Sequence, residues 1–123
     1  MDAIDVAMTK QVLTAMALAL AVTPLGLAHA VLVEATPAIN ASVPGPDIAV
    51  QLRFNSRIDA ARSQLSVVLP GQSVRPLPLA PQTSPETLNS RVTGLGSGTY
   101  RLRWQVLAAD GHITRGEVPF QIK

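Results

Sequence analysis

The chain has 123 residues, enough for one domain, and no cysteine, which excludes disulfide scaffolds, zinc fingers, thiol nucleophiles and iron–sulfur sites. Charged residues make up only 15% of it and aromatic residues 3%, with a formal net charge of +2, which argues against a dedicated nucleic-acid binder. Ten prolines and eight glycines indicate many turns and favour a β-rich domain over a helical bundle.

The N-terminal segment has the pattern of an export signal. Lys10 precedes an apolar run at residues 12–22, and small residues follow at Gly26 and Ala28. The run is too short to span a bilayer, which needs about 20 apolar residues. A basic residue, a short apolar run and small residues two apart predict a secretory signal peptide covering residues 1–28.

Two cleavage sites fit the small-residue rule. Cleavage after Ala28 makes His29 the first residue of the mature chain, whereas cleavage after Ala30 makes it Val31. The translation start is also open, because a start at Met8 gives the signal a more ordinary basic beginning. The choice of cleavage site decides whether a histidine stands at the mature N-terminus.

The rest of the chain alternates apolar and polar residues with a period of two. This alternation is typical of strands with one face on a core and one face in water. It is clearest in residues 48–55, 99–107 and 117–123, and weaker in residues 30–35, 64–69, 74–79 and 87–93.

About seven short strands with regular turns predict an all-β fold, an antiparallel sandwich or Greek-key barrel. Trp104, the single tryptophan, is expected to anchor the core. Pro76, Pro78 and Pro119 are expected at sheet edges or at non-hydrogen-bonded positions, because proline has no N–H for the ladder.

The two histidines, His29 and His112, are the candidates for metal chemistry. His112 follows Asp110 by two residues just after a predicted strand, and in extended backbone that spacing places both side chains on one side. A carboxylate and an imidazole directed at one point suit a metal ion or an acid–base pair. An isolated Asp-x-His is a weak signal, since Asp-Gly is also an ordinary turn.

A mature N-terminal histidine strengthens the metal interpretation. The amine and the ring Nδ1 of His29 can chelate one ion, His112 adds a third nitrogen, and Asp110 adds an oxygen. Nitrogens in a plane with a carboxylate favour Cu(II) over Zn(II). Soft Cu(I) prefers sulfur ligands, but the chain has no cysteine and its three methionines all precede His29.

Several segments resemble the CopC family of periplasmic copper-resistance proteins. Residues 29–37 (HAVLVEATP) begin with histidine, have leucine three residues later and end in Thr-Pro, and residues 52–56 (LRFNS) resemble the family's second strand. Residues 98–116 (GTYRLRWQVLAADGHITRG), followed by FQIK at 120–123, resemble its C-terminal signature. The resemblance covers essentially all of residues 29–123.

The resemblance implies a cupredoxin-like, immunoglobulin-like Greek-key β-sandwich at residues 29–123, with cleavage after Ala28. It implies one Cu(II) ion held by the amine and ring of His29, by Asp110 and by His112, and no Cu(I) site. It further implies a monomeric periplasmic copper carrier or buffer for copper homeostasis and resistance. Such a protein is not an enzyme, and an inner-membrane copper transporter of the CopD type is its expected partner. No hydrophobic span follows residue 28, so we expect the free periplasmic form.

Two positions depart from the pattern of the family. Many relatives have a glutamate two residues after the strand phenylalanine, where this chain has Ser56. The support of the N-terminal amine by neighbouring groups is therefore an open question, and such groups tune metal affinity. Ile113 replaces the proline that often follows Asp-Gly-His.

Two other functions compete with copper carriage. A terminal-histidine copper site is similar to the histidine brace of polysaccharide-oxidising copper enzymes, although this chain has few aromatic residues for sugar stacking. A metal-free sandwich could instead bind a partner through an edge strand. Reductant-dependent oxygen consumption would indicate the first, and the absence of Cu(II) binding would indicate the second.

Overall fold

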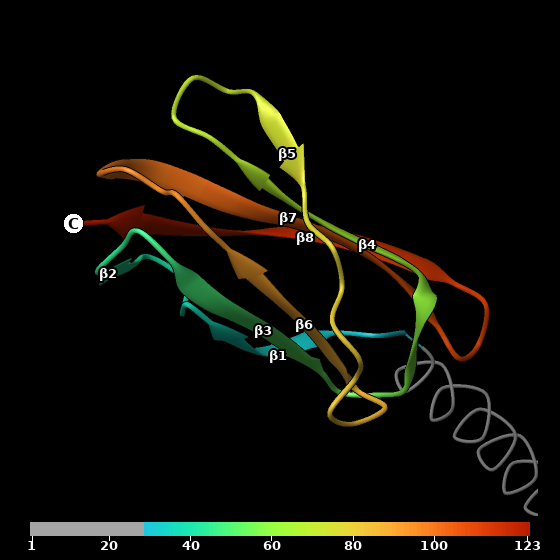
Figure 1. The fold of residues 1–123 in the computed structure, drawn as a ribbon. Coiled ribbons are helices and arrows are strands. Elements are labelled where there is room, and N and C mark those ends of the chain that lie inside the picture. The colour runs from blue at the N-terminus through green and yellow to red at the C-terminus, as the bar shows by residue number, and fades with distance from the viewer. Residues whose placement is uncertain (1–28) are drawn as a thin grey trace, which may run out of the picture.

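The computed structural model describes residues 29–123, all of them in strands, turns and loops (Figure 1). The predicted signal peptide, residues 1–28, lies outside the described residues. Eight strands form two sheets that face each other, which confirms the predicted all-β sandwich. In this part of the chain there is no helix of the length and apolar character that a membrane span requires.

The smaller sheet has three antiparallel strands in the order β1-β3-β6. These strands are β1 (Leu32–Thr36), β3 (Ile48–Phe54) and β6 (Thr87–Val92). The larger sheet has five strands in the order β2-β8-β7-β4-β5. These are β2 (Ala41–Val43), β8 (Ile113–Ile122), β7 (Gly98–Ala108), β4 (Ile58–Val68) and β5 (Val74–Pro76).

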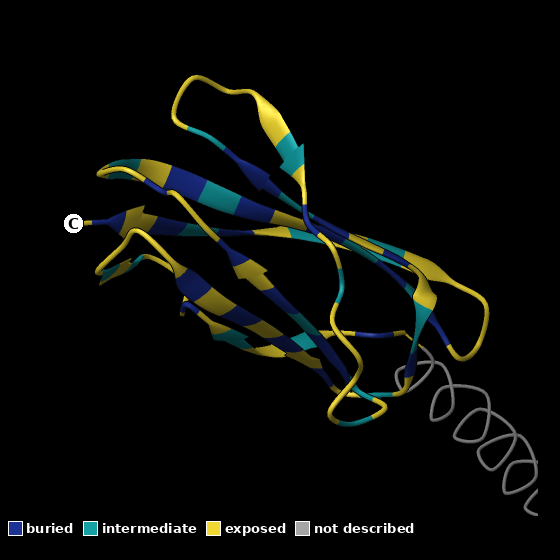
Figure 2. Ribbon diagram, viewed as in Figure 1, coloured by how far each residue is buried: buried dark blue, intermediate teal, exposed yellow. Residues whose placement is uncertain are grey.

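The alternating segments of the sequence form the strands that carry the core. Every second residue of β3, and of β7 from Tyr100 onward, is buried, and the residues between them are exposed or half-buried (Figure 2). Side chains on successive strand residues point to opposite faces, so this alternation directs one apolar face of each sheet toward the other. The core therefore lies between the two sheets.

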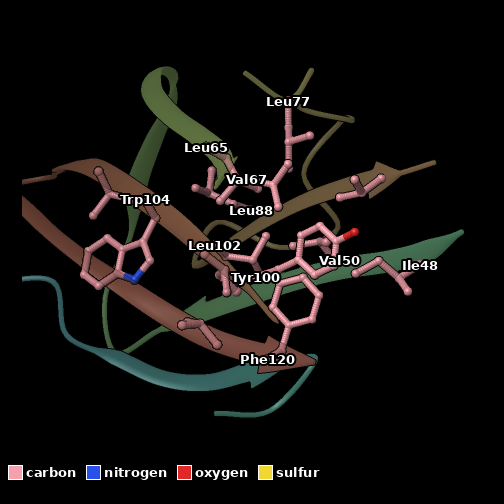
Figure 3. Packing of buried hydrophobic residues seen from close by; sticks show 14 of the residues in the cluster. Ile48, Val50, Leu65, Val67, Leu77, Leu88, Tyr100, Leu102, Trp104 and Phe120 are labelled. Atoms are coloured by element: carbon pink, nitrogen blue, oxygen red, sulfur yellow. The ribbon is translucent and has the colours of Figure 1, made fainter. Parts of the chain in front are cut away.

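Aromatic residues hold the centre of this core. Trp104 is buried as predicted, and its ring meets that of Phe54 edge-on with centroids 5.1 Å apart. Tyr100 and Phe120, opposite each other on β7 and β8, stack with centroids 5.6 Å apart (Figure 3). Trp104 thus joins the two sheets, because Phe54 belongs to β3 and Trp104 to β7.

The structure has one strand more than the seven expected, and β4 is longer than expected. β2 has only three residues and pairs with β8 in parallel, so it is too short for alternation to show. The first half of β4 lacks alternation because a register shift falls between Asp59 and Gln64. There the Ser63 hydroxyl is buried, donates to the Asp59 carbonyl at 2.6 Å and accepts from the Leu107 N–H.

The three prolines lie where their missing N–H is tolerated. Pro76 lies on β5, the edge strand, and Pro78 lies outside the strands. The carbonyl of Pro119 accepts from Asn40, beside the start of β2. The backbone N and C=O of one strand residue point toward the same neighbouring strand. Because the carbonyl of Pro119 points toward β2, its nitrogen does too, and no hydrogen bond to β7 is lost. The expectation for all three is confirmed.

Candidate metal centre

The β7–β8 turn brings Asp110 and His112 together. The turn closes through bonds from Ala108 N–H to His112 C=O at 2.8 Å and from Gly111 N–H to Ala108 C=O at 3.0 Å. Gly111 has φ of +87°, a left-handed conformation that favours glycine. The Asp-Gly-His sequence therefore folds into a tight turn with its carboxylate and imidazole side by side.

His29 is brought to the same place by the segment that follows it. Ala30 is buried, and its carbonyl accepts a bond from Thr114 Oγ1 of β8 at 3.1 Å. Val31 pairs with Asn55, just after β3: its N–H donates to Asn55 Oδ1 at 2.8 Å, and its carbonyl accepts from the Asn55 N–H at 2.9 Å. Three hydrogen bonds, one to β8 and two to the residue after β3, thus fix the two residues after His29.

All three predicted ligand residues converge. His29, Asp110 and His112 each offer one ligand atom, and these atoms lie within 4.8 Å of one another. The two imidazole rings meet edge-on with centroids 4.9 Å apart, although 82 positions of sequence separate the residues. All three residues are exposed, so an ion has direct access from solvent.

Both oxygens of Asp110 are engaged by His112. The His112 N–H donates to Oδ1 at 3.0 Å, and the ring Nδ1 donates to Oδ2 at 2.8 Å, because an ionised carboxylate only accepts. The backbone N–H of His112, and after it the ring, holds the pKa of Asp110 below its ordinary value. The carboxylate therefore remains an anion well into the acid range, in the state that binds a cation.

The donor set fits a divalent ion with nitrogen and oxygen ligands. Adjacent ligands of a tetragonal ion with bonds of about 2.0 Å stand about 2.8 Å apart. The observed separation of Nδ1 and Oδ2 is also 2.8 Å, so both atoms lie close enough to bind one ion.

Sequence reasoning missed the two residues that hold the N-terminal segment. Asn55 directly precedes Ser56, and Ser56 makes no side-chain hydrogen bond with another of residues 29–123. Asn55 and Thr114 instead bind the backbone of the segment itself. No motif marks them, because an asparagine after a strand and a threonine within one are common.

Comparison with known proteins assigns nearly all of the described residues to one family. The CopC domain matches residues 32–123. Protein YobA of Escherichia coli strain K12 is 31% identical over 105 residues, covering 83% of this chain and 85% of the relative. Copper resistance protein C of Xanthomonas campestris pv. juglandis is 29% identical over 104 residues, covering 78% of this chain and 81% of the relative. The crystal structure of CopC from Methylosinus trichosporium OB3b superposes with a TM-score of 0.69 at 28% identity, covering 77% of this chain and 94% of that one.

Proposed function

The chain belongs to the CopC family, and from this premise we propose that it is a periplasmic protein that holds one Cu(II) ion, as a carrier or buffer in copper homeostasis and resistance. The observation that carries the proposal is the convergence of His29, Asp110 and His112 within 4.8 Å. A relative named for copper resistance and a similar solved CopC structure support copper as the ion.

The proposal requires removal of residues 1–28. Within the uncut chain the nitrogen of His29 belongs to a peptide bond with Ala28, and an amide N–H is a poor ligand. Cleavage after Ala28 turns this nitrogen into an amine that can chelate with the ring Nδ1 of the same residue. The domain at residues 29–123 is then the functional protein, and His29, Asp110 and His112 supply three nitrogens and one oxygen.

The donor types support Cu(II) rather than Cu(I). Residues 29–123 contain neither methionine nor cysteine, so no soft sulfur ligand is available to Cu(I) in the mature chain. Imidazole, amine and carboxylate groups bind divalent ions, and their affinity peaks at copper in the first-row series.

The exposure of the centre supports carriage over catalysis. An ion held by exposed side chains at one end of a sandwich is accessible to a receiving protein, for which we propose a membrane copper transporter of the CopD type. A polysaccharide oxidase needs exposed aromatic rings beside its copper, whereas all four aromatic residues of the chain are buried in the core: Phe54, Tyr100, Trp104 and Phe120.

Copper titration of the purified mature protein tests the proposal. The chain that begins at His29 should bind one Cu(II) in native mass spectrometry and remain monomeric. His29→Ala and a chain beginning at Val31 should each lose tight binding, since both remove the chelating pair. Equal Cu(II) affinity of the Val31 chain would overturn the proposed site. Reductant-dependent oxygen consumption by the copper-loaded protein would overturn the non-catalytic role.

A further inference from the structure

The outer face of the larger sheet carries an excess of arginine. Across β4, β7 and β8 the residues that face each other form three rows, because directly paired residues of antiparallel strands place their side chains on one face. The rows are Gln64, Gln105 and Arg115; Ser66, Arg103 and Glu117; and Val68, Arg101 and Pro119. Figure 2 shows exposed and half-buried residues alternating with buried ones along β7 and β8.

This face carries three guanidinium groups and one carboxylate, which pairs with two of them. Arg101 Nε and Arg103 Nε both donate to the same Glu117 oxygen, Oε2, at 3.3 Å each. Arg115 Nε donates to Gln105 Oε1 at 2.7 Å, which leaves its charge without an ion pair among residues 29–123. The face therefore carries two positive charges in excess of its one negative charge.

The arginines line two hollows in the same face. A hollow of about 350 Å³ lies between the first two rows, with Arg103, Arg115 and Glu117 in its lining. A second hollow of about 280 Å³ lies further along the strands, lined by Arg101, Pro119 and, from the β4–β5 loop, Pro70. The first hollow, which Trp104 also lines, thus offers charge and hydrogen bonds beside an apolar wall, and the second offers apolar walls beside a single charge.

We propose that this face of β7 and β8 binds an extended acidic segment of a partner protein. Carboxylates of the segment pair with Arg103 and Arg115, and an apolar side chain occupies the second hollow beside Pro70. From Thr99 to Gln105 the strand spans about 20 Å at the rise of a β-strand, so about six extended residues fit along it. Guanidinium groups bind carboxylates through two parallel N–H donors, which single ammonium groups do not provide.

The residues of the face favour a polypeptide over a lipid surface. Membrane-binding faces combine cations with apolar side chains that enter the bilayer. The exposed large hydrophobic residues of the described chain line neither hollow: Val31, Val33, Ile39, Val74 and Ile113. Beside Trp104, the first hollow is bordered by the amide and hydroxyl side chains of Gln64, Gln105 and Ser66, which suit a peptide backbone and its carboxylates.

This inference does not depend on copper binding, and metal-free protein tests it. The probe is a fluorescently labelled dodecapeptide of two Glu-Ser-Glu-Ser-Leu-Ser repeats, in which two glutamates and then a leucine share one face of the extended chain. It is compared by fluorescence anisotropy with a peptide that has glutamine in place of each glutamate. The double variant Arg103→Gln/Arg115→Gln removes two charges from the face. Its control, Arg53→Gln/Arg91→Gln, removes two exposed charges from the other sheet, on β3 and β6.

The purified protein should bind the glutamate peptide and not the glutamine peptide. Arg103→Gln/Arg115→Gln should lower the affinity for the glutamate peptide by about tenfold or more. The affinity of the control Arg53→Gln/Arg91→Gln should stay within about twofold of that of the unmodified protein. Equal losses in both double variants, or no binding of the glutamate peptide, would overturn the proposal. Binding to phosphatidylglycerol vesicles in the absence of peptide binding would also overturn it and assign the face to a membrane.

Discussion

Asp110 organises the candidate metal centre before any ion binds. Its two oxygens accept bonds from the N–H and the ring of His112, so the same groups that organise the turn are available to an ion. The carboxylate thereby fixes the direction of the imidazole before an ion arrives. Preorganised ligands bind an ion more tightly because less conformational freedom is lost on binding.

Replacing Asp110 by asparagine should therefore weaken Cu(II) binding by at least about tenfold, the lower end of the range for groups that orient metal ligands. The variant loses both a charge and an acceptor at the centre. Competition titration against a chelator of known affinity measures the loss. Asp47→Asn is the matched control, since Asp47 bonds the Gly94 N–H away from the centre. Equal affinity of D110N and the native protein would exclude a role for Asp110.

Asn55 controls the placement of His29 through the backbone of Val31. We expect Asn55→Ala to lower Cu(II) affinity by about tenfold, because a loosened N-terminal segment no longer holds the amine and ring beside His112. The Cu(II) electron paramagnetic resonance spectrum should show a mixture of centres instead of one. Asn89→Ala on β6 serves as control, and an unchanged spectrum and affinity in N55A would contradict this role.

At the scale of the elements, β7 and β8 depend on the absence of a side chain at Gly116. Gly116 lies opposite Trp104, and a Cβ at this position would stand 2.7 Å from Cε2 of the indole. Trp104 is packed against Phe54 and has little room to retreat. Glycine is thus required here for its size.

Gly116→Ala should destabilise the fold by about 1–3 kcal/mol, the usual cost of overpacking a core. Denaturant unfolding followed by Trp104 fluorescence measures this free energy. Gly71→Ala is the control, because a Cβ at Gly71 meets nothing within 4 Å. If both variants unfolded at the same denaturant concentration, the close packing of Trp104 on β8 would be refuted.

The elements also show what the sequence can predict. β3 and β7 were predictable because each buries one face, so apolar and polar residues alternate along them in the sequence. β2 and the first half of β4 were not, because their pairing depends on distant strands and on the buried hydroxyl of Ser63. Among the site residues, the Asp-Gly-His turn was visible locally. The anchoring roles of Asn55 and Thr114 arise only when the N-terminal segment docks on β3 and β8.

At the scale of the whole molecule, the candidate centre joins the N-terminal end of the domain to the β7–β8 turn. The bond between Thr114 and the Ala30 carbonyl spans 84 residues, and the Asn55 bonds attach the same segment to the other sheet. The N-terminal end of the domain and the β7–β8 turn lie at the same end of the sandwich in Figure 1. The sandwich thus brings His29, Asp110 and His112 together, although they are far apart in sequence.

Cu(II) affinity should be lower at about pH 5.5 than at about pH 7.5, because nitrogen ligands bind an ion only when they have released their protons. Protons compete with the ion for the imidazoles and the amine. Asp110 contributes little to this change, because its lowered pKa keeps the carboxylate ionised throughout. Its own interactions with His112 are present above the ordinary carboxyl pKa and are lost only as the pH falls through the lowered value. Chelator competition at the two pH values measures the trend, and an affinity independent of pH would contradict the ligand set.

The central claim is that His29 becomes the first residue of the functional chain, and N-terminal sequencing of the exported protein tests it most directly. We predict His-Ala-Val-Leu-Val as the first five residues, which results from cleavage after Ala28. A mature chain that begins at Val31, or one that keeps residues 1–28, has no terminal amine on His29 and would contradict the proposed copper centre.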